Sequence, residues 1–137
     1  MNRTAYHILR VGMAVTFLWI GILILKEPES WGLTYLQPWA MGLLPVPIKQ
    51  AMVGTAILDI LIGTALLLNF LVWLGALLGS IHLVIVLTVS GINTVTVRDI
   101  GLLVAALALT IESFPKSLAL KLRSWIKPPS RPVPPAI

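Results

Sequence analysis

The chain has 137 residues, of which 58% are hydrophobic and 11% charged. Soluble domains contain about 45–50% apolar and about 25% charged residues, so this composition argues against a water-soluble protein and indicates a membrane protein. The formal net charge is +5, and the chain has no cysteine. Disulfides, thiol redox pairs and thiolate metal sites are therefore excluded.

Four apolar segments approach the roughly 20 residues that a helix needs to cross a bilayer. They cover about residues 8–25, 48–68, 71–89 and 98–113. The first continues into Lys26 and Glu27 instead of a small-residue cleavage site, so it is interpreted as a retained helix and not as a signal peptide. Asn69-Phe70 marks a tight turn, and residues 90–94 break the pattern again. The sequence thus predicts an all-α integral membrane protein, with an antiparallel four-transmembrane-helix bundle in residues 1–114.

The longest connection, Lys26 to Pro47, mixes apolar residues with aromatic rings and prolines. The rings are those of Trp31, Tyr35 and Trp39. Amphipathic rings are favoured at the level of the lipid headgroups. The pattern favours a membrane-interface anchor or a short re-entrant piece, and the alternative is a lid over a substrate site.

The segment over residues 115–127 is predicted to be an amphipathic interfacial helix. One face is apolar, with Leu118, Leu122, Trp125 and Ile126, and the opposite face is basic, with Lys116, Arg123 and Lys127. Such a helix is expected to lie along the membrane surface. The proline-rich residues 128–137 form a tail that is expected to be extended polyproline, with a solvated end as the simplest interpretation.

Orientation follows from the distribution of lysine and arginine. Seven of the ten flank the two termini, and the other three are Lys26, Lys49 and Arg98. The positive-inside rule then predicts a multi-pass protein of the cell membrane with both termini in the cytoplasm. The basic charge indicates contact with lipid surfaces and no nucleic-acid partner, because no soluble basic face exists.

Small and polar residues at helical spacing mark the helix faces that are expected to be buried, since helices in lipid associate through close packing and polar contacts. The expected faces are Gly12, Thr16 and Trp19 on the first span, Thr55, Asp59 and Gly63 on the second, Gly75, Gly79, His82 and Val86 on the third, and Arg98, Gly101, Ala105, Ala108 and Glu112 on the fourth.

Asp59 and His82 are the ionisable residues nearest mid-span. At 1.5 Å per residue, Asp59 is about 16 Å and His82 about 18–19 Å from the turn at Asn69-Phe70, so antiparallel helices bring them to one level. An unpaired charge at that depth is costly, and the two are expected to face each other. They are either a ligand-binding or proton-handling site or a polar clasp that fixes the helix register.

Arg98 and Asp99 are further candidates for ligand binding or proton handling, although one or both could simply begin the fourth helix at the interface. No catalytic residue is identified. The sequence contains no phosphate loop, nucleophile elbow or metal motif, and His7 and His82 lie too far apart in depth for a bis-histidine haem. No metal site and no intrinsic cofactor are therefore predicted.

Several segments between residues 8 and 112 form a pattern. They are Arg10-Val11-Gly12, Trp19-Ile20-Gly21, Pro28-Glu29-Ser30-Trp31, the acidic Ile57-Leu58-Asp59-Ile60-Leu61-Ile62-Gly63, His82 and, as the most specific, Thr96-Val97-Arg98-Asp99-Ile100-Gly101-Leu102-Leu103. In these segments the chain resembles DoxX-type membrane proteins. The resemblance implies a four-helix membrane fold with internal termini and, since the family is named after a small subunit of a thiosulfate:quinone oxidoreductase, an association with redox enzymes.

Three functions are consistent with this reading. The first is a small membrane subunit of a quinone-linked redox or respiratory-type complex, in which a quinone binds among the helices and the carboxylate and imidazole handle protons. A partner would supply the electron carrier. The second is a non-catalytic structural or assembly subunit of a larger membrane complex, and the third is a small proton-coupled transporter that acts as an oligomer. Partner subunits or further copies of the chain are expected in each case, and whether the chain is itself an enzyme is left open.

Overall fold

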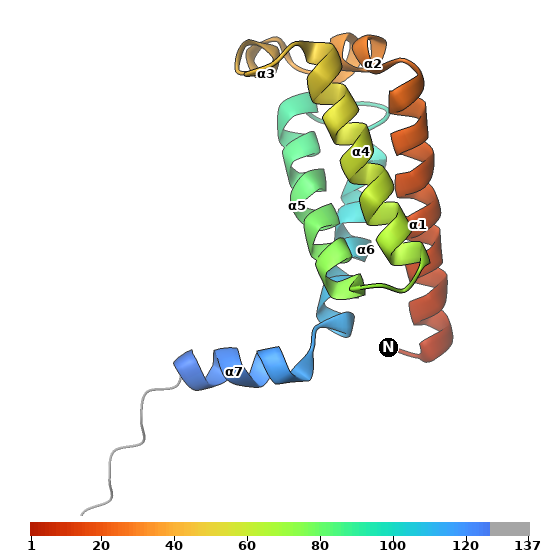
Figure 1. The fold of residues 1–137 in the computed structure, drawn as a ribbon, viewed down its shortest axis with the longest axis vertical. Coiled ribbons are helices and arrows are strands. Elements are labelled where there is room, and N and C mark those ends of the chain that lie inside the picture. Colours follow the sequence, from red (N-terminus) through yellow and green to blue (C-terminus); the bar gives the residue numbers. More distant parts are fainter. Residues whose placement is uncertain (127–137) are drawn as a thin grey trace, which may run out of the picture.

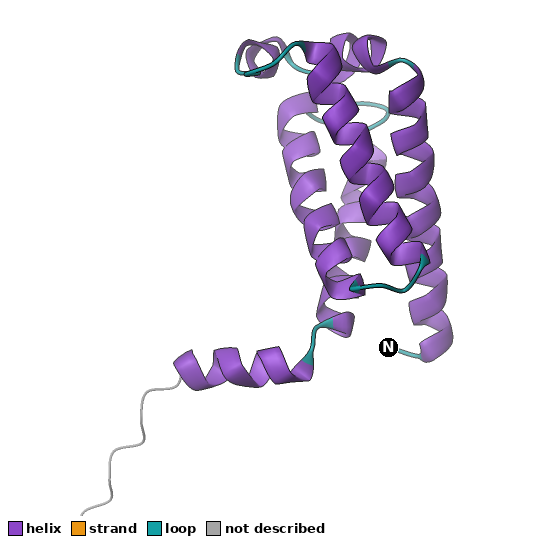
Figure 2. Ribbon diagram, viewed as in Figure 1, coloured by secondary structure: helices purple, strands orange, loops and turns teal. Residues whose placement is uncertain are grey.

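The computed structural model describes residues 1–126, which form helices and no strand (Figures 1 and 2). The helices are α1 (Arg3–Lys26), α2 (Pro28–Tyr35), α3 (Pro38–Gly42), α4 (Ile48–Leu67), α5 (Val72–Ser90), α6 (Val97–Ser113) and α7 (Lys116–Ile126). The predicted all-α fold is therefore confirmed for this part of the chain.

Within the described residues, three helices are long and apolar enough to cross a membrane, namely α1, α4 and α5. The helix α6 is shorter, with 17 residues. The bounds of α4, α5 and α6 agree with the predicted segments to within a residue, whereas α1 begins at Arg3 instead of near residue 8. The side chain of Asn2 accepts a hydrogen bond from the Thr4 backbone N–H at 3.0 Å, and this cap starts the helix ahead of the apolar run.

The four long helices pack side by side into a helical bundle (Figure 1). Helix α1 packs mainly on α4 and α5 mainly on α6, and contacts of α4 with α5 and of α1 with α6 complete the arrangement. The core contains large apolar side chains from all four helices, among them Met13, Phe17, Ile62, Leu66, Leu83 and Leu109.

Two glycines bring the backbones of α1 and α4 into close approach. A Cβ atom at Gly63 would lie 2.9 Å from the backbone nitrogen of Leu18 and 3.0 Å from the carbonyl oxygen of Ala14. A Cβ atom at Gly21 would lie 2.9 Å from the carbonyl oxygen of Ala56. Because backbone atoms are among the nearest neighbours at both points and cannot move aside as a flexible side chain can, a larger residue would force the helices apart.

The predicted buried faces are confirmed on two helices and wrong on the other two. On α4 and α5 the buried residues include Asp59, Gly63, Gly75, Gly79 and His82, as expected. On α1 the buried face instead carries Arg10, Met13, Ala14, Phe17, Gly21 and Ile24. On α6 it carries Asp99, Ala106, Leu109 and Thr110, while Arg98, Gly101, Ala108 and Glu112 are exposed. Small residues occur around both helices, and the large side chains that fill the core decide which face turns inward.

Arg10 has a structural role that the sequence did not reveal. The side chain is only 8% exposed, and Nη1 donates hydrogen bonds to the carbonyl oxygens of Leu66 and Leu67, the latter at 2.9 Å. These carbonyls end α4 and have no partner within the helix. The guanidinium therefore caps α4, where a positive charge also interacts favourably with the helix dipole.

We expect Arg10→Ala to lower the free energy of unfolding by about 2 kcal/mol, because it removes two hydrogen bonds from a charged donor, one to a buried and one to a part-buried carbonyl. Thermal or denaturant unfolding of the purified protein in detergent measures this loss. Arg3→Ala is the matched control, since Arg3 is exposed on the same helix. Equal stability of the two variants would contradict the capping role.

The helices α2 and α3 lie across one end of the bundle (Figure 1). The backbone N–H of Gln37, between them, donates to the carbonyl oxygen of Val89 at 2.9 Å, and its side-chain Nε2 lies 3.4 Å from the carbonyl oxygen of Ser90. On α2, Gly32 packs against Ile48 of α4. The segment is thus attached to both α4 and α5.

The opposite end of the bundle holds the N-terminus and the end of α6. The amino group of Met1 and Oε1 of Glu112 form an ion pair at 2.8 Å. From there α7 projects away from the bundle axis (Figure 1), and Trp125 on it is 82% exposed. The predicted helix after Pro115 is confirmed up to Ile126, and its position on a membrane surface stays a prediction. Lys127 and the predicted proline-rich tail over residues 128–137 lie outside the described residues.

Candidate functional site

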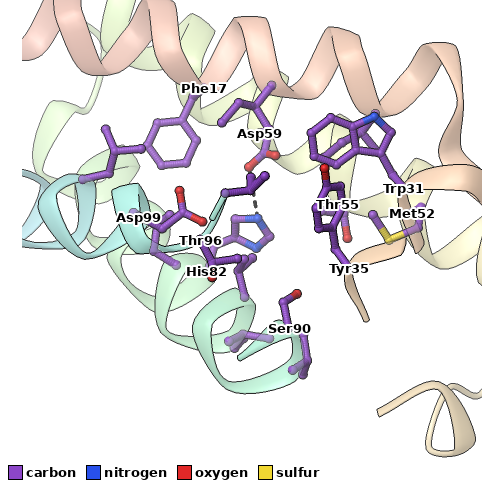
Figure 3. A pocket seen from close by; sticks show the side chains of 18 of the residues that line it. Phe17, Trp31, Tyr35, Met52, Thr55, Asp59, His82, Ser90, Thr96 and Asp99 are labelled. Carbon is purple, nitrogen blue, oxygen red and sulfur yellow. Dashed lines mark ion pairs between the residues drawn. The ribbon is translucent and has the colours of Figure 1, made fainter. Parts of the chain in front are cut away.

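A cavity of about 190 Å³ lies between the long helices, near the end that α2 covers (Figure 3). Its walls come from α1, α2, α4, α5, α6 and the loop that precedes α6. Most lining side chains are apolar, and three carry a carboxyl or imidazole group: Asp59, His82 and Asp99. The cavity is therefore mainly apolar, with two carboxyl groups and one imidazole in its wall.

Asp59 and His82 face each other across this cavity, as the sequence predicted (Figure 3). His82 Nε2 lies 3.1 Å from Asp59 Oδ1, and the side chains are 10% and 4% exposed. The two atoms are close enough for an ion pair, but Oδ1 forms no hydrogen bond. The imidazole is therefore not aligned to donate to this oxygen. The two side chains are in contact, yet the buried oxygen Oδ1 accepts no hydrogen bond.

The turn between α4 and α5 sets the common level of the two residues. Asn69 and Leu71 adopt positive φ angles of 56° and 43°, which reverse the chain within a few residues. Next to the pair, Gly79 admits the ring of Phe17, since a Cβ atom there would lie 3.0 Å from Phe17 Cζ. The ring and the close helix packing hold the pair in an apolar setting.

Asp99 joins the pair at the cavity wall, whereas Arg98 does not. Asp99 is 7% exposed and lines the cavity, while Arg98 is exposed and its Nε donates to the carbonyl oxygen of Val95 at 3.3 Å. Adjacent helical residues point about 100° apart, so only one of the two can face inward. Of the four candidate residues, the cavity brings together Asp59, His82 and Asp99.

The loop before α6 fixes the direction of Asp99. The Oδ1 atom of Asn93 accepts hydrogen bonds from the backbone N–H groups of Val95 at 2.8 Å and Thr96 at 3.0 Å. The hydroxyl of Thr96 donates to the Gly91 carbonyl at 2.5 Å and accepts from the Asn93 N–H at 2.9 Å. This network of a turn-forming asparagine and a buried threonine starts α6 at one defined angle.

Two cavity residues, Trp31 and Tyr35 on α2, were assigned to the membrane interface by the sequence analysis. Both line the cavity, with ring centroids 5.0 Å apart and an angle of 46° between the ring planes. Their spacing of four residues places them on one helix face, which is the signal that could have found them. The segment therefore forms part of the cavity wall, and its position relative to a bilayer stays a prediction.

The charge balance of the cavity restricts its chemistry. Among the residues that the structure describes, no lysine or arginine lines it, and the lining holds two carboxylates and a single imidazole. Within residues 1–126, no three histidine, aspartate or glutamate side chains come together in a group that could hold a metal ion. The arrangement can accept hydrogen bonds and can exchange protons with a small molecule.

Comparisons with family models, with curated proteins and with solved structures give no match to this chain.

Proposed function

We propose that this chain is a small membrane subunit of a quinone-linked redox complex, and that its cavity binds the quinone ring. The observation that carries the proposal is the buried pair of Asp59 and His82 inside a mostly apolar cavity. Ionisable groups inside a membrane protein are expensive to bury and commonly serve a ligand or a proton path.

The chemistry of the cavity suits a ring compound that carries oxygen atoms. Apolar side chains and the rings of Trp31 and Tyr35 can pack on a ring, while a few polar groups at one end orient it. Reduction or oxidation of a quinone moves protons as well as electrons. A carboxylate beside an imidazole can deliver or receive such protons near neutral pH.

The electrons must come from or go to another component, and the proposal places that carrier in a partner subunit. Purification in mild detergent is therefore expected to recover a second protein or an oligomer of this chain. Extraction of the gently purified protein, followed by mass spectrometry, should identify a bound quinone. Extracts that hold phospholipid only, at full recovery of the protein, would contradict the proposal.

The membrane arrangement is part of the proposal. Helix α6 spans about 26 Å from its 17 residues, close to the hydrocarbon thickness of about 30 Å, and serves as a fourth span beside α1, α4 and α5. The termini are placed in the cytoplasm of the cell, with α7 on the cytoplasmic membrane surface. The cavity and α2 then lie toward the outer side.

Cysteines introduced at Ser30 and Ser130 test this topology. We expect a membrane-impermeant thiol reagent added to intact cells to label Ser30→Cys only, and Ser130→Cys to react only after the cells are opened. The native chain has no cysteine, so it provides an unlabelled background. Labelling of both positions in intact cells would exclude the proposed orientation.

A further inference from the structure

The inner end of the cavity is rich in hydrogen-bond acceptors. The carboxylates of Asp59 and Asp99 are 3% and 7% exposed and both line the cavity. Oδ1 of Asp59 has no hydrogen-bond partner, although it is buried. Buried acceptors without partners are uncommon, so this atom points to a donor that a ligand could supply.

Donors are scarce at the same end. The hydroxyl of Thr16 donates to the Gly12 carbonyl at 3.0 Å, and that of Thr96 donates to the Gly91 carbonyl. His82 Nε2 already faces Asp59. With no lysine or arginine in the lining formed by the described residues, the imidazole of His82 is the only basic side chain beside the carboxylates in the cavity wall.

The donor groups of Trp31, Tyr35 and Thr55 lie toward the other end of the cavity. Figure 3 shows Trp31 and Tyr35 grouped beside Thr55, on the side of the chamber away from Asp99, with Ser90 at its edge. A ring bound in the cavity would thus meet carboxylate acceptors at its inner edge and aromatic rings with donor groups farther out. The acceptors lie at one end of the site and the donors at the other, and we call this arrangement the one-sided polarity of the site.

From this one-sided polarity we infer that the cavity binds the reduced, dihydroxy form of its ring ligand more tightly than the oxidised form; the inference rests on the proposed function. A quinone carbonyl can only accept hydrogen bonds, whereas a quinol hydroxyl donates one. The quinol can donate a hydrogen bond to Asp59 Oδ1, whereas the quinone leaves this atom without a hydrogen bond and with only its ion-pair contact to His82 Nε2. The same reasoning predicts binding of simple phenols with apolar tails.

The expected preference is about tenfold in the dissociation constant, since one buried acceptor gains or loses its partner. Tighter binding of the reduced form raises the reduction potential of the bound couple. For a two-electron couple, a tenfold ratio corresponds to about 30 mV. A raised potential makes the bound quinone easier to reduce, so it favours electron transfer from the partner subunit to the ring.

Equilibrium dialysis of the full chain in detergent under anaerobic conditions tests the inference. The probes are a short-tailed benzoquinone and the same compound after chemical reduction. We expect the quinol to bind about tenfold more tightly than the quinone. In Asp59→Asn the side-chain amide can donate, so the preference should disappear or reverse. Thr64→Ala, on the exposed face of α4, should retain it.

The outcomes separate the inference from the proposed function. Equal affinities, or tighter binding of the quinone, would overturn the inference but leave a quinone site in place. Binding of neither form would overturn both. If Asp59→Asn fails to fold, as judged by gel filtration, Asp99→Asn provides the second test, and the comparison of the two probes on the unmodified chain decides by itself.

Discussion

Asp59→Asn is expected to weaken binding of the reduced quinone analogue at least about tenfold while the protein folds and purifies normally. The amide keeps the size and shape of the carboxyl group, but it cannot carry the charge that faces His82 Nε2 at 3.1 Å. A hydrogen bond from a quinol hydroxyl to a charged carboxylate contributes about 1.5–3 kcal/mol, whereas one to a neutral amide contributes about 1 kcal/mol. Dialysis binding, together with the unfolding midpoint of the same preparation, measures the effect.

The same experiment distinguishes a binding site from a packing clasp. If the pair only fixes the register of α4 and α5, Asp59→Asn and His82→Asn should lower stability, and any loss of binding should follow that loss. A site predicts weaker binding at nearly unchanged stability. Thr64→Ala controls for a polar substitution on the outer face of α4 and should change neither quantity.

Gly63→Leu is expected to cause the largest loss of stability, about 3 kcal/mol or more. Its Cβ atom would fall 2.9 Å from the backbone nitrogen of Leu18, and backbone cannot move aside as a flexible side chain can. The contact between α1 and α4 is the most extensive in the bundle, so their separation would also open the wall of the cavity. Denaturant titration in detergent and the monodisperse fraction on gel filtration report the change.

Gly54→Leu is the matched control for this substitution. Gly54 lies on the same helix, and a Cβ atom there meets nothing within 4 Å. We expect the control to retain full stability, since the added side chain faces outward. Equal losses in the two variants would show that the close approach of the backbones does not explain the effect, because leucine has the higher helix propensity at both positions.

Hydropathy and turn residues predicted the long helices well because spans of this kind are set by length and apolar content, which are local properties. The pairing of Asp59 with His82 was also predictable. This prediction required only that the two residues lie at nearly equal distances from a tight turn and have small residues beside them. Both features can be identified in the sequence. Glycines at contact points, such as Gly63 and Gly79, carried the same information.

The outward face of α6 and the role of Arg10 could not be predicted in this way. Ala105 and Ala106 are equally small, and the choice between their faces depends on which side chains fill the space left by the other helices. Arg10 looked like one of the charges at a helix edge, and its bonds to Leu66 and Leu67 depend on contacts across 56 and 57 residues. Such long-range contacts have no periodic signature.

The sequence favoured a membrane-interface segment for α2 over the alternative of a lid above a site, and the structure places α2 against the cavity. Aromatic residues near a helix end are typical of a membrane interface, and that expectation uses no information about what lies beneath them. Here Trp31 and Tyr35 share one face, and Gln37 attaches the following segment to the end of α5. Two aromatic residues spaced four apart and one polar anchor thus place this segment in the cavity wall.

Photolabelling with an azido-quinone, followed by peptide mass spectrometry, is the most direct test of the central claim that the cavity binds a quinone ring. The account predicts labels on residues that line the cavity, such as Trp31, Met52 and Val86, and loss of these labels when excess quinol is added. Labels confined to outward-facing residues such as Trp19, Leu61 and Ile111, unchanged by the competitor, would contradict it.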